Sequence, residues 1–276
     1  MLEQTFCHIP GIGARTEAGL WAAGICSWDG VAGHAGLPSR RAALLTAHAE
    51  ESLARLAARD AAFFSARLPA NQHWRLFPHF RDRLAYLDIE TTGLGAPGDH
   101  ITTIALYDGH AIRHYVHGEN LDRFPHDIRG YDLLVTFNGK GFDVPFIESA
   151  FGIRLAKPHI DLRHVLASLG YRGGLKLVER ALGFDRGELA DVDGYFAVLL
   201  WHDYIRKQNR AALDTLLAYN MLDTVNLEAL MVHAYNMKVA HTPFASALHL
   251  PTPTAPAIPF TPDMPTVARL RRQYLG

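Results

Sequence analysis

Apolar positions recur at helical spacing early in the chain and then gather into strand-like runs. Residues 38–68 are rich in Ala and Arg with apolar residues at roughly helical spacing, which predicts an amphipathic helix. The apolar runs at 84–89 and 132–137 predict strands. Residues 101–118 predict a β-hairpin, because Asp108-Gly109 is a strong turn signal between two β-rich runs.

Helical spacing dominates the second half of the chain. The predicted helices cover residues 143–151, 161–169, 175–182, 195–207 and 210–235. A strand, a hairpin and a further strand followed by helices predict a mixed β-sheet flanked by helices, which is an α/β fold.

Both ends of the chain differ from this central part in residue composition and in the pattern of apolar positions. The first residues place Gly turns around a short helical stretch, whereas HLPTPTAPAIPFTPDMP (249–265) is too rich in Pro for regular structure and precedes a short basic helix. The chain is therefore predicted to divide into a small helical unit (1–36), a helical connector (37–74), the α/β domain (75–238) and a Pro-rich tail (239–276).

Composition places the chain among ordinary globular proteins. Of its 276 residues, 49% are hydrophobic and 20% are charged, and no apolar run approaches the roughly 18 residues of a membrane span. The N-terminus lacks a basic start and an apolar stretch typical of a signal peptide, so we expect a cytoplasmic protein. Cys7 and Cys26 are then expected to be reduced thiols.

The net charge of −1, from 27 basic and 28 acidic residues, carries no basic footprint of the kind typical of nucleic-acid binding. Any contact with nucleic acid must therefore use local patches.

Two carboxylates interrupt the first predicted strand. Asp88 and Glu90 are two residues apart in LAYLDIETTGLG, so their side chains point to the same face. Like charges on one face repel unless a cation lies between them, and Mg²⁺ is typically held by a few carboxylates and water. By itself, such a pair also fits a solvated strand end before a turn.

Further carboxylates follow at informative places. Asp143 comes just after a strand and a Gly-rich loop, and Tyr219 and Asp223 are four apart, on one face of a predicted helix. The neighbours of Asp223 are mostly apolar, which predicts partial burial, where an unpaired carboxylate is costly.

The order of these motifs resembles that of the DEDD 3′–5′ exonucleases. DIETTGL is similar to the first family motif, FNGKGFDVPFI to the second, and the Tyr four residues before the last Asp marks the DEDDy branch. GLKLVERALGF (174–184) and YNMLDTVNLEAL (219–230) resemble a group of bacterial predicted exonucleases with an RNase H-like fold. The resemblance covers about residues 84–235.

This resemblance implies a site with two divalent ions, Mg²⁺ or Mn²⁺. Asp88 would bridge both ions, Glu90 and Asp223 would complete the first site, and Asp143 would hold the second. Tyr219 would orient the attacking water, since a phenol with a pKa near ~10 is a poor base at neutral pH. The convergence of Asp143 and Asp223 is a prediction about the fold.

The resemblance also implies contacts to a nucleic-acid strand. The candidates lie in the motif loops and on one helix: Thr91, Thr92, Gly93, Leu94, Asn138, Lys140, Phe142 and Lys176. Phe142 and Phe146 are suited to base stacking or to packing, and Lys176 to a phosphate contact or to plain solvation. Asp161 is predicted to cap a helix, the alternative being a fifth carboxylate at the site.

The N-terminal stretch HIPGIGARTEAGLWAAGI resembles a helix–hairpin–helix element. Gly11, Ile12 and Gly13 would form its turn, and backbone N–H groups of Gly11 and Gly13 would approach a phosphate without reading bases. The alternative is a helical hairpin that packs on the α/β domain, and Arg15 is the only basic residue near the turn.

These features favour a metal-dependent 3′–5′ exonuclease acting on single-stranded ends, of DNA rather than RNA, and free of any membrane. Two alternatives remain open: a ribonuclease or structure-specific nuclease, and a non-catalytic nucleic-acid-binding module. Nothing in the sequence identifies a protein partner.

Overall fold

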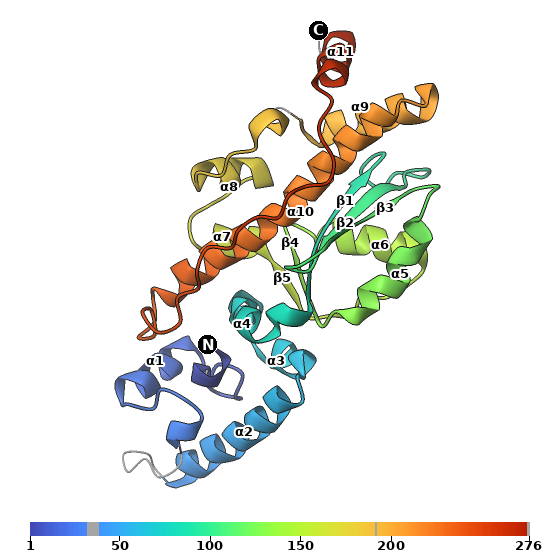
Figure 1. Cartoon of the computed structure of the whole chain (residues 1–276). Helices are drawn as coiled ribbons and strands as arrows, with labels where there is room; N and C mark the ends of the chain where they lie inside the picture. Colours follow the sequence, from blue (N-terminus) through green and yellow to red (C-terminus); the bar gives the residue numbers. More distant parts are fainter. Residues whose placement is uncertain (32–38, 191, 275–276) are drawn as a thin grey trace.

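A five-stranded mixed sheet organises the centre of the molecule (Figure 1). The computed structural model describes residues 1–31, 39–190 and 192–274. The strands are β1 (Leu84–Thr91), β2 (Ile101–Tyr107), β3 (Ile112–Val116), β4 (Leu133–Thr136) and β5 (His159–Asp161). Their order is β3-β2-β1-β4-β5, with β1–β2 and β2–β3 antiparallel and β1–β4 and β4–β5 parallel. This mixed sheet with its helices confirms the predicted α/β class.

Helices cover both faces of the sheet and both ends of the molecule. They are α1 (Ala14–Ala22), α2 (Ser39–Ala57), α3 (Ala61–Arg67), α4 (Phe77–Phe80), α5 (Phe124–Asp127), α6 (Asp143–Phe151), α7 (Leu162–Ala167), α8 (Leu175–Ala181), α9 (Gly194–Lys207), α10 (Arg210–Val239) and α11 (Met264–Tyr274). In the described part of the chain, no helix combines the length and apolar character that crossing a membrane requires.

The alternation of β1 assigns its side chains to two cores. Leu87 and Ile89 pack with α5 and α6 on one face, through residues such as Phe124 and Ile147. Tyr86 points to the opposite face and joins the core formed with α10. Because Asp88 and Glu90 continue the even-numbered series, they lie on the face that α10 crosses (Figure 1).

Several predicted elements differ from the structure. Among the smaller differences, β1 continues to Thr91 instead of ending at 89, and α7 covers Leu162–Ala167 instead of 161–169. The helix predicted over 38–68 is two helices, because Arg59 has a left-handed φ of 55° and the Asp60 carboxylate accepts from Phe63 N–H at 2.9 Å to cap α3. Position 38 lies outside the described residues. Strand β5 was not expected, since three residues are too few for a pattern. Helix α10 continues four residues beyond the predicted end at Tyr235.

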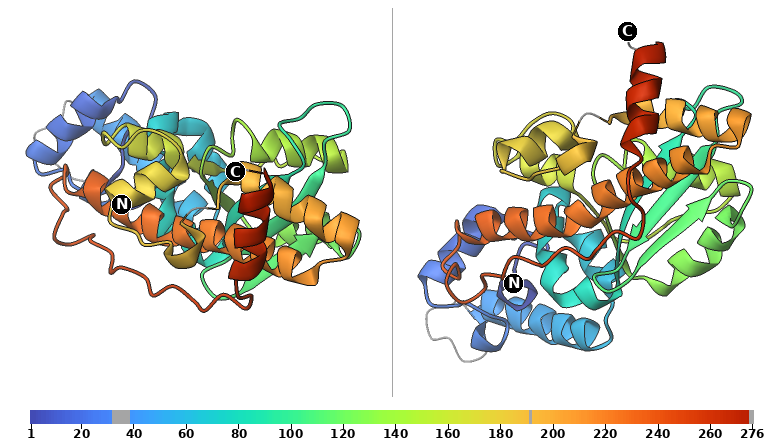
Figure 2. Two further views of the ribbon diagram at one scale, coloured as in Figure 1. Left: turned by 90° about the horizontal axis from the view of Figure 1, so that it is seen from above. Right: turned by 45° about the horizontal axis from the view of Figure 1, so that its top comes forward.

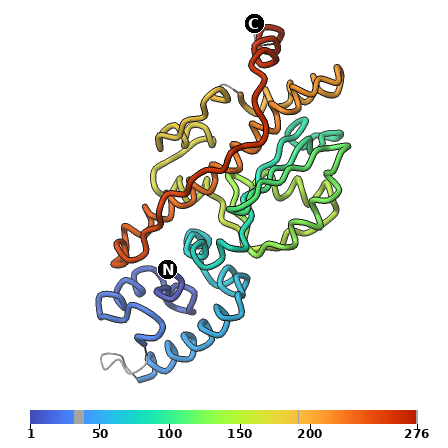
Figure 3. Tube along the Cα trace, in the orientation of Figure 1, coloured from blue at the N-terminus to red at the C-terminus, as the bar shows by residue number. Residues whose placement is uncertain are grey.

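The N-terminal region is helical and packs on the C-terminal half of α10 (Figure 3). Trp74 contacts Tyr235 of α10 with ring centroids 5.7 Å apart. Gly11 has a φ of 80° in the turn before α1, and the element ahead of that turn is a short 3₁₀ helix, Leu2–Gln4. The N-terminal region therefore packs on the α/β domain.

The chain after α10 has no helix or strand until α11, which confirms the prediction for the Pro-rich tail. Figure 2 shows this segment running back along α10. The Asn236 side chain holds it by donating to Leu250 C=O at 2.8 Å and accepting from Leu250 N–H at 2.9 Å. Further on, Asp263 N–H donates to Thr215 Oγ1 at 2.9 Å.

Candidate metal centre

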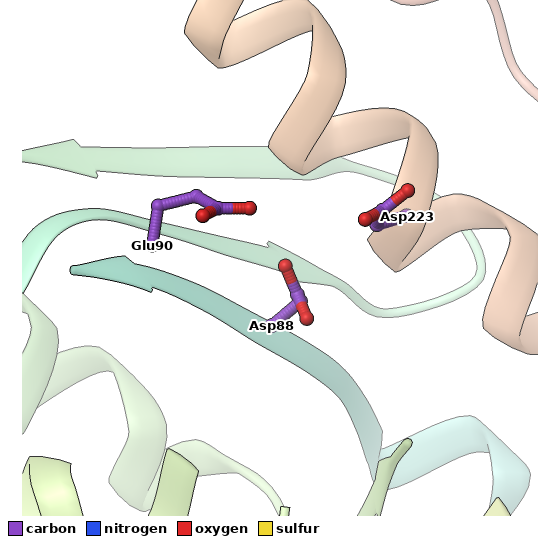
Figure 4. A group of neighbouring side chains, drawn as sticks. All are labelled: Asp88, Glu90 and Asp223. Carbon is purple, nitrogen blue, oxygen red and sulfur yellow. The ribbon is translucent and has the colours of Figure 1, made fainter. Parts of the chain in front are cut away.

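Strand β1 and helix α10 bring three carboxylates together. Asp88, Glu90 and Asp223 each offer an oxygen atom, and these atoms all lie within 4.8 Å of one another (Figure 4). Asp88 is half-buried, and Glu90 and Asp223 are buried. The group is called the carboxylate cluster below. Carboxylates at this spacing could together bind a hard divalent cation, which prefers oxygen ligands.

Asp143 lies beside the carboxylate cluster. It is the first residue of α6, it is buried, and its carboxylate accepts from Ile89 N–H at 3.2 Å. Ile89 separates Asp88 from Glu90 in β1, so Asp143 reaches the strand between the two ligand candidates. Asp143 is not one of the three residues of the carboxylate cluster.

The pKa values of the carboxyl groups at this site are raised, so a bound cation would stabilise their charged forms. Burial, followed by repulsion from neighbouring carboxylates, raises the pKa of Asp88 and of Glu90 well above their usual values. Burial raises the pKa of Asp143 to about 7, although hydrogen bonds from backbone N–H groups oppose this shift. Burial also raises the pKa of Asp223, against the opposing effect of Arg186. These four carboxyl groups, three of them buried and Asp88 half-buried, thus favour protonation unless a positive ion compensates them, and the donor set fits a divalent metal.

Tyr219 lies one helical turn before Asp223 on α10 and is buried. Burial, and then the charges of Asp223, Glu90 and Asp88, raise the pKa of its phenol far above the usual value. The hydroxyl group therefore stays protonated. Lys176 of α8 places its Nζ 5.3 Å from the centre of the Tyr219 ring, so this candidate does lie near the site.

Asn220 contacts the cluster and was not expected from the sequence. It is fully buried, its Nδ2 donates to Asp88 Oδ2 at 2.6 Å, and its Oδ1 accepts from Thr103 Oγ1 at 3.0 Å. This hydrogen bond lowers the pKa of Asp88 against the larger effect of burial. The available signal was a polar residue on the sheet-facing side of a buried helix, since such a group needs a partner.

Arg186 is the second residue that sequence reasoning missed. Its guanidinium forms ion pairs with Asp223 and with Glu179 of α8. Glu179 is fully buried and also accepts from Asn226 Nδ2 at 2.8 Å. These partners come from separate elements, so no local pattern could have indicated them.

Residues 85–235, more than half of the chain, match the family model of the RNase H superfamily. The chain belongs to the RNase H superfamily. Among curated proteins it is similar to the uncharacterized protein YprB of Bacillus subtilis (strain 168), with 32% identity over 178 residues. That alignment covers 55% of this chain and 42% of YprB, so the chain spans less than half the length of this relative.

Among solved structures, the chain is similar to the family B DNA polymerase of the hyperthermophilic archaeon Pyrobaculum calidifontis. The identity is 17%, the TM-score is 0.42, and the likeness covers 57% of this chain and 24% of the polymerase chain.

In this RNase H superfamily chain, four of the residues predicted to contact a nucleic-acid strand lie at the end of β1 and in the loop after it. Thr91 is the last residue of β1, and Thr92, Gly93 and Leu94 begin the loop. Leu94 is 91% exposed. Gly93 faces Asp99, where a Cβ would lie 2.5 Å from the carboxylate oxygens. Asp99 accepts from Gly95 N–H at 2.9 Å and from Ala96 N–H at 2.7 Å, so hydrogen bonds within the loop define its conformation.

This loop and α6 line an open cavity of about 510 Å³, and one of its lining residues, Phe142, directly precedes Asp143. Leu94, Phe142 and Phe146 line it. The centroids of the two Phe rings lie 5.7 Å apart. Both Phe side chains thus pack together and border an open space, so the two interpretations of Phe142 are compatible.

The loop before Asp143 is shaped by Asp161. The Asp161 carboxylate accepts from Asn138 N–H at 2.8 Å and from Lys140 N–H at 3.1 Å. It also caps α7 through Arg163 N–H, which confirms the predicted N-cap. Asn138 has a φ of 67°, and Lys140 is exposed.

Two of the residues predicted to contact a nucleic-acid strand lie far from the carboxylate cluster. Gly11 and Gly13 are exposed in the turn before α1, near the C-terminal end of α10 (Figure 1). They line a separate hollow together with Arg67.

Proposed function

We propose that this chain is a metal-dependent 3′–5′ exonuclease that hydrolyses phosphodiester bonds at single-stranded nucleic-acid ends, with DNA preferred to RNA. The observation that carries the proposal is the grouping of Asp88, Glu90 and Asp223 within 4.8 Å, with Tyr219 one turn away and Asp143 against the same strand.

The carboxylates supply the ligands that this chemistry needs. Asp88, Glu90 and Asp223 would hold one divalent ion, and Asp143 with Asp88 would hold a second. When bound, such ions lower the pKa of water and stabilise the attacking and leaving oxygens of an in-line displacement. Asn220 keeps the Asp88 carboxylate oriented through its 2.6 Å hydrogen bond.

Tyr219 would orient the attacking water rather than remove its proton. The pKa of the phenol is raised, chiefly by burial, so the group remains a hydroxyl at neutral pH. A hydroxyl is both a donor and an acceptor, which suits it to hold a water molecule in one direction.

The cavity between the loop after β1 and α6 would accept a terminal nucleotide. Leu94 and Phe142 offer apolar contact to a base, which needs no particular sequence. Lys140, Asn138 and Lys176 provide the polar groups for the phosphates. In the four-segment division of the chain, 75–238 would carry this activity. The turn of Gly11 and Gly13 would add a distant phosphate contact.

A digestion assay tests the proposal. Nucleotide release from uniformly labelled single-stranded DNA and from RNA of the same sequence is measured with Mg²⁺, with Mn²⁺ and with EDTA. Asp88→Asn should abolish release. Asp122→Asn, a change at an exposed carboxylate in the short 3₁₀ helix Leu121–Arg123, should not alter it.

Release in EDTA, or equal release by Asp88→Asn and the wild type, would refute the metal mechanism. Faster release from RNA would replace DNA by RNA as the substrate. Binding of the strands without any release in either metal would favour a nucleic-acid-binding module instead.

A further inference from the structure

Arg186 enters the carboxylate cluster from the segment that follows α8. Its side chain is 5% exposed, and its guanidinium forms ion pairs on two sides, with Asp223 and with Glu179. The Nε group is buried without a hydrogen-bond partner among the described residues. A buried arginine with one donor unused is therefore held directly at a candidate metal ligand.

The two carboxylates that Arg186 contacts have different surroundings. Glu179 is fully buried, lies outside the carboxylate cluster and is fixed by Asn226 Nδ2 at 2.8 Å. Asp223 belongs to the cluster and faces Asp88 and Glu90. Glu179 is thus a permanent anchor for the guanidinium, whereas Asp223 is a partner that a metal ion would also require.

A guanidinium and a divalent ion on one carboxylate repel each other. Binding of the ion therefore favours loosening of the Arg186–Asp223 pair, while the pair with Glu179 keeps the side chain in place. The carbon centre of the guanidinium lies 5.5 Å from the centre of the Tyr219 ring, so a freed edge would remain beside the residue proposed to orient the attacking water.

We propose that Arg186 exchanges partners during the reaction: it neutralises Asp223 while the site holds no metal, releases it when an ion binds, and then presents its free guanidinium edge to a substrate phosphate. The phosphate contact rests on the proposed nuclease function, whereas the exchange with a metal ion does not. Arginine suits both positions, because its planar fork pairs bidentately with carboxylates and phosphates and stays charged.

The competing explanation is that Arg186 only ties α8 to α10. In that case, its removal would leave Asp223 poorly placed, and the affinity of the site for a metal ion would fall. The exchange predicts the opposite sign, because removal of Arg186 frees Asp223 for the ion.

The first test is a Mn²⁺ titration of the full chain. Binding is measured by calorimetry or from the signal of free Mn²⁺. Arg186→Gln should bind Mn²⁺ about tenfold more tightly than the wild type, because the ion no longer has to displace a charge-assisted hydrogen bond from Asp223 and the loss of one such bond is of that size. The matched control is Lys176→Gln, which removes a positive charge beside the same Tyr219 ring from a residue with no described ion pair. It reports the effect of charge alone.

Binding by Arg186→Gln that is no tighter than that of Lys176→Gln would overturn the exchange. Arg186→Lys covers the case in which the glutamine variant does not fold. It keeps the charge but cannot span both carboxylates with a fork, so it should still bind Mn²⁺ more tightly than the wild type. Equal or weaker binding would contradict the proposal.

The second test measures the affinity for a fluorescent oligonucleotide whose terminal linkages are phosphorothioates that resist cleavage. Addition of Ca²⁺ in place of EDTA should strengthen binding about tenfold more for the wild type than for Arg186→Gln, since one lost hydrogen-bonded ion pair is of that size. Equal gains would overturn the phosphate contact. Neither readout requires cleavage, so an absence of nucleotide release in the digestion assay would refute the nuclease function separately.

Discussion

Asn220 is the residue whose removal tests the organisation of the carboxylate cluster most sharply. The change Asn220→Ala deletes the donor to Asp88 Oδ2 and leaves the Thr103 hydroxyl without its acceptor. The Thr103 hydroxyl lies where water has little access, since Thr103 and Asn220 are fully buried, whereas Asp88 is half-buried. The perturbation is therefore local and chemically simple.

The magnitude follows from the type of bond. A hydrogen bond to a charged group is worth about 1.5–3 kcal/mol, and roughly 1.4 kcal/mol corresponds to a tenfold change in an equilibrium constant. Loss of the bond also raises the pKa of Asp88 further, so more of its carboxyl group is protonated and less is available to an ion. We expect the affinity for Mn²⁺ to fall about 10- to 100-fold at neutral pH.

The assay is a Mn²⁺ titration at several pH values, with a thermal melt to establish folding. Thr103→Val is the matched control, because it removes only the neutral bond that steadies Asn220, worth about 0.5–1.5 kcal/mol, and should weaken binding far less. A folded Asn220→Ala protein with an affinity within about twofold of the wild type, well below the range expected for such groups, would refute this reasoning.

Four further outcomes follow from the same structure. Because burial raises the pKa of Asp143 to about 7, the folded state binds its proton more tightly than the unfolded state does. The difference in the free energy of unfolding between the metal-free wild type and Asp143→Asn, from urea titrations, should therefore fall as pH rises from about 4 through about 7, and a difference that does not change with pH would contradict this. Asp88→Asn should raise the melting temperature without metal while abolishing nucleotide release, since it removes one of several repelling charges; a lower melting temperature would count against the repulsion. Leu94→Ala should leave the melting temperature unchanged and slow release from the strand end, because the side chain is 91% exposed; normal release would remove it from the substrate site. Arg75→Ala should lower the free energy of unfolding by about 3–5 kcal/mol, as it breaks a buried ion pair, whereas Arg83→Ala at an exposed pair should cost below about 1 kcal/mol, and similar losses would refute the distinction.

The local part of the site could be predicted because it depends on short-range periodicity. Asp88 and Glu90 share a face of β1 through the two-residue repeat of a strand, and Tyr219 and Asp223 share a face of α10 through the helical repeat. The sheet, its hairpin and the helices around it follow from equally local signals, and the structure confirms the α/β class.

The rest of the site depends on tertiary packing that these patterns do not encode. Arg186 reaches Asp223 across 37 positions of the chain, and Asn220 reaches Asp88 across 132. The break between α2 and α3 was missed for a different reason: the apolar spacing continues through it, while Arg59 and the cap at Asp60 end one helix and start the next.

The most direct measurement is the polarity of digestion. A 5′-labelled single-stranded oligonucleotide is incubated with the full chain in Mg²⁺, beside the same strand closed into a circle and beside the Asp88→Asn protein. A ladder that shortens from the 3′ end of the linear strand, with the circle intact and no ladder from the variant, is the result we predict. Cleavage of the circle, release of the labelled 5′ nucleotide as the first product, or an intact linear strand would contradict the account.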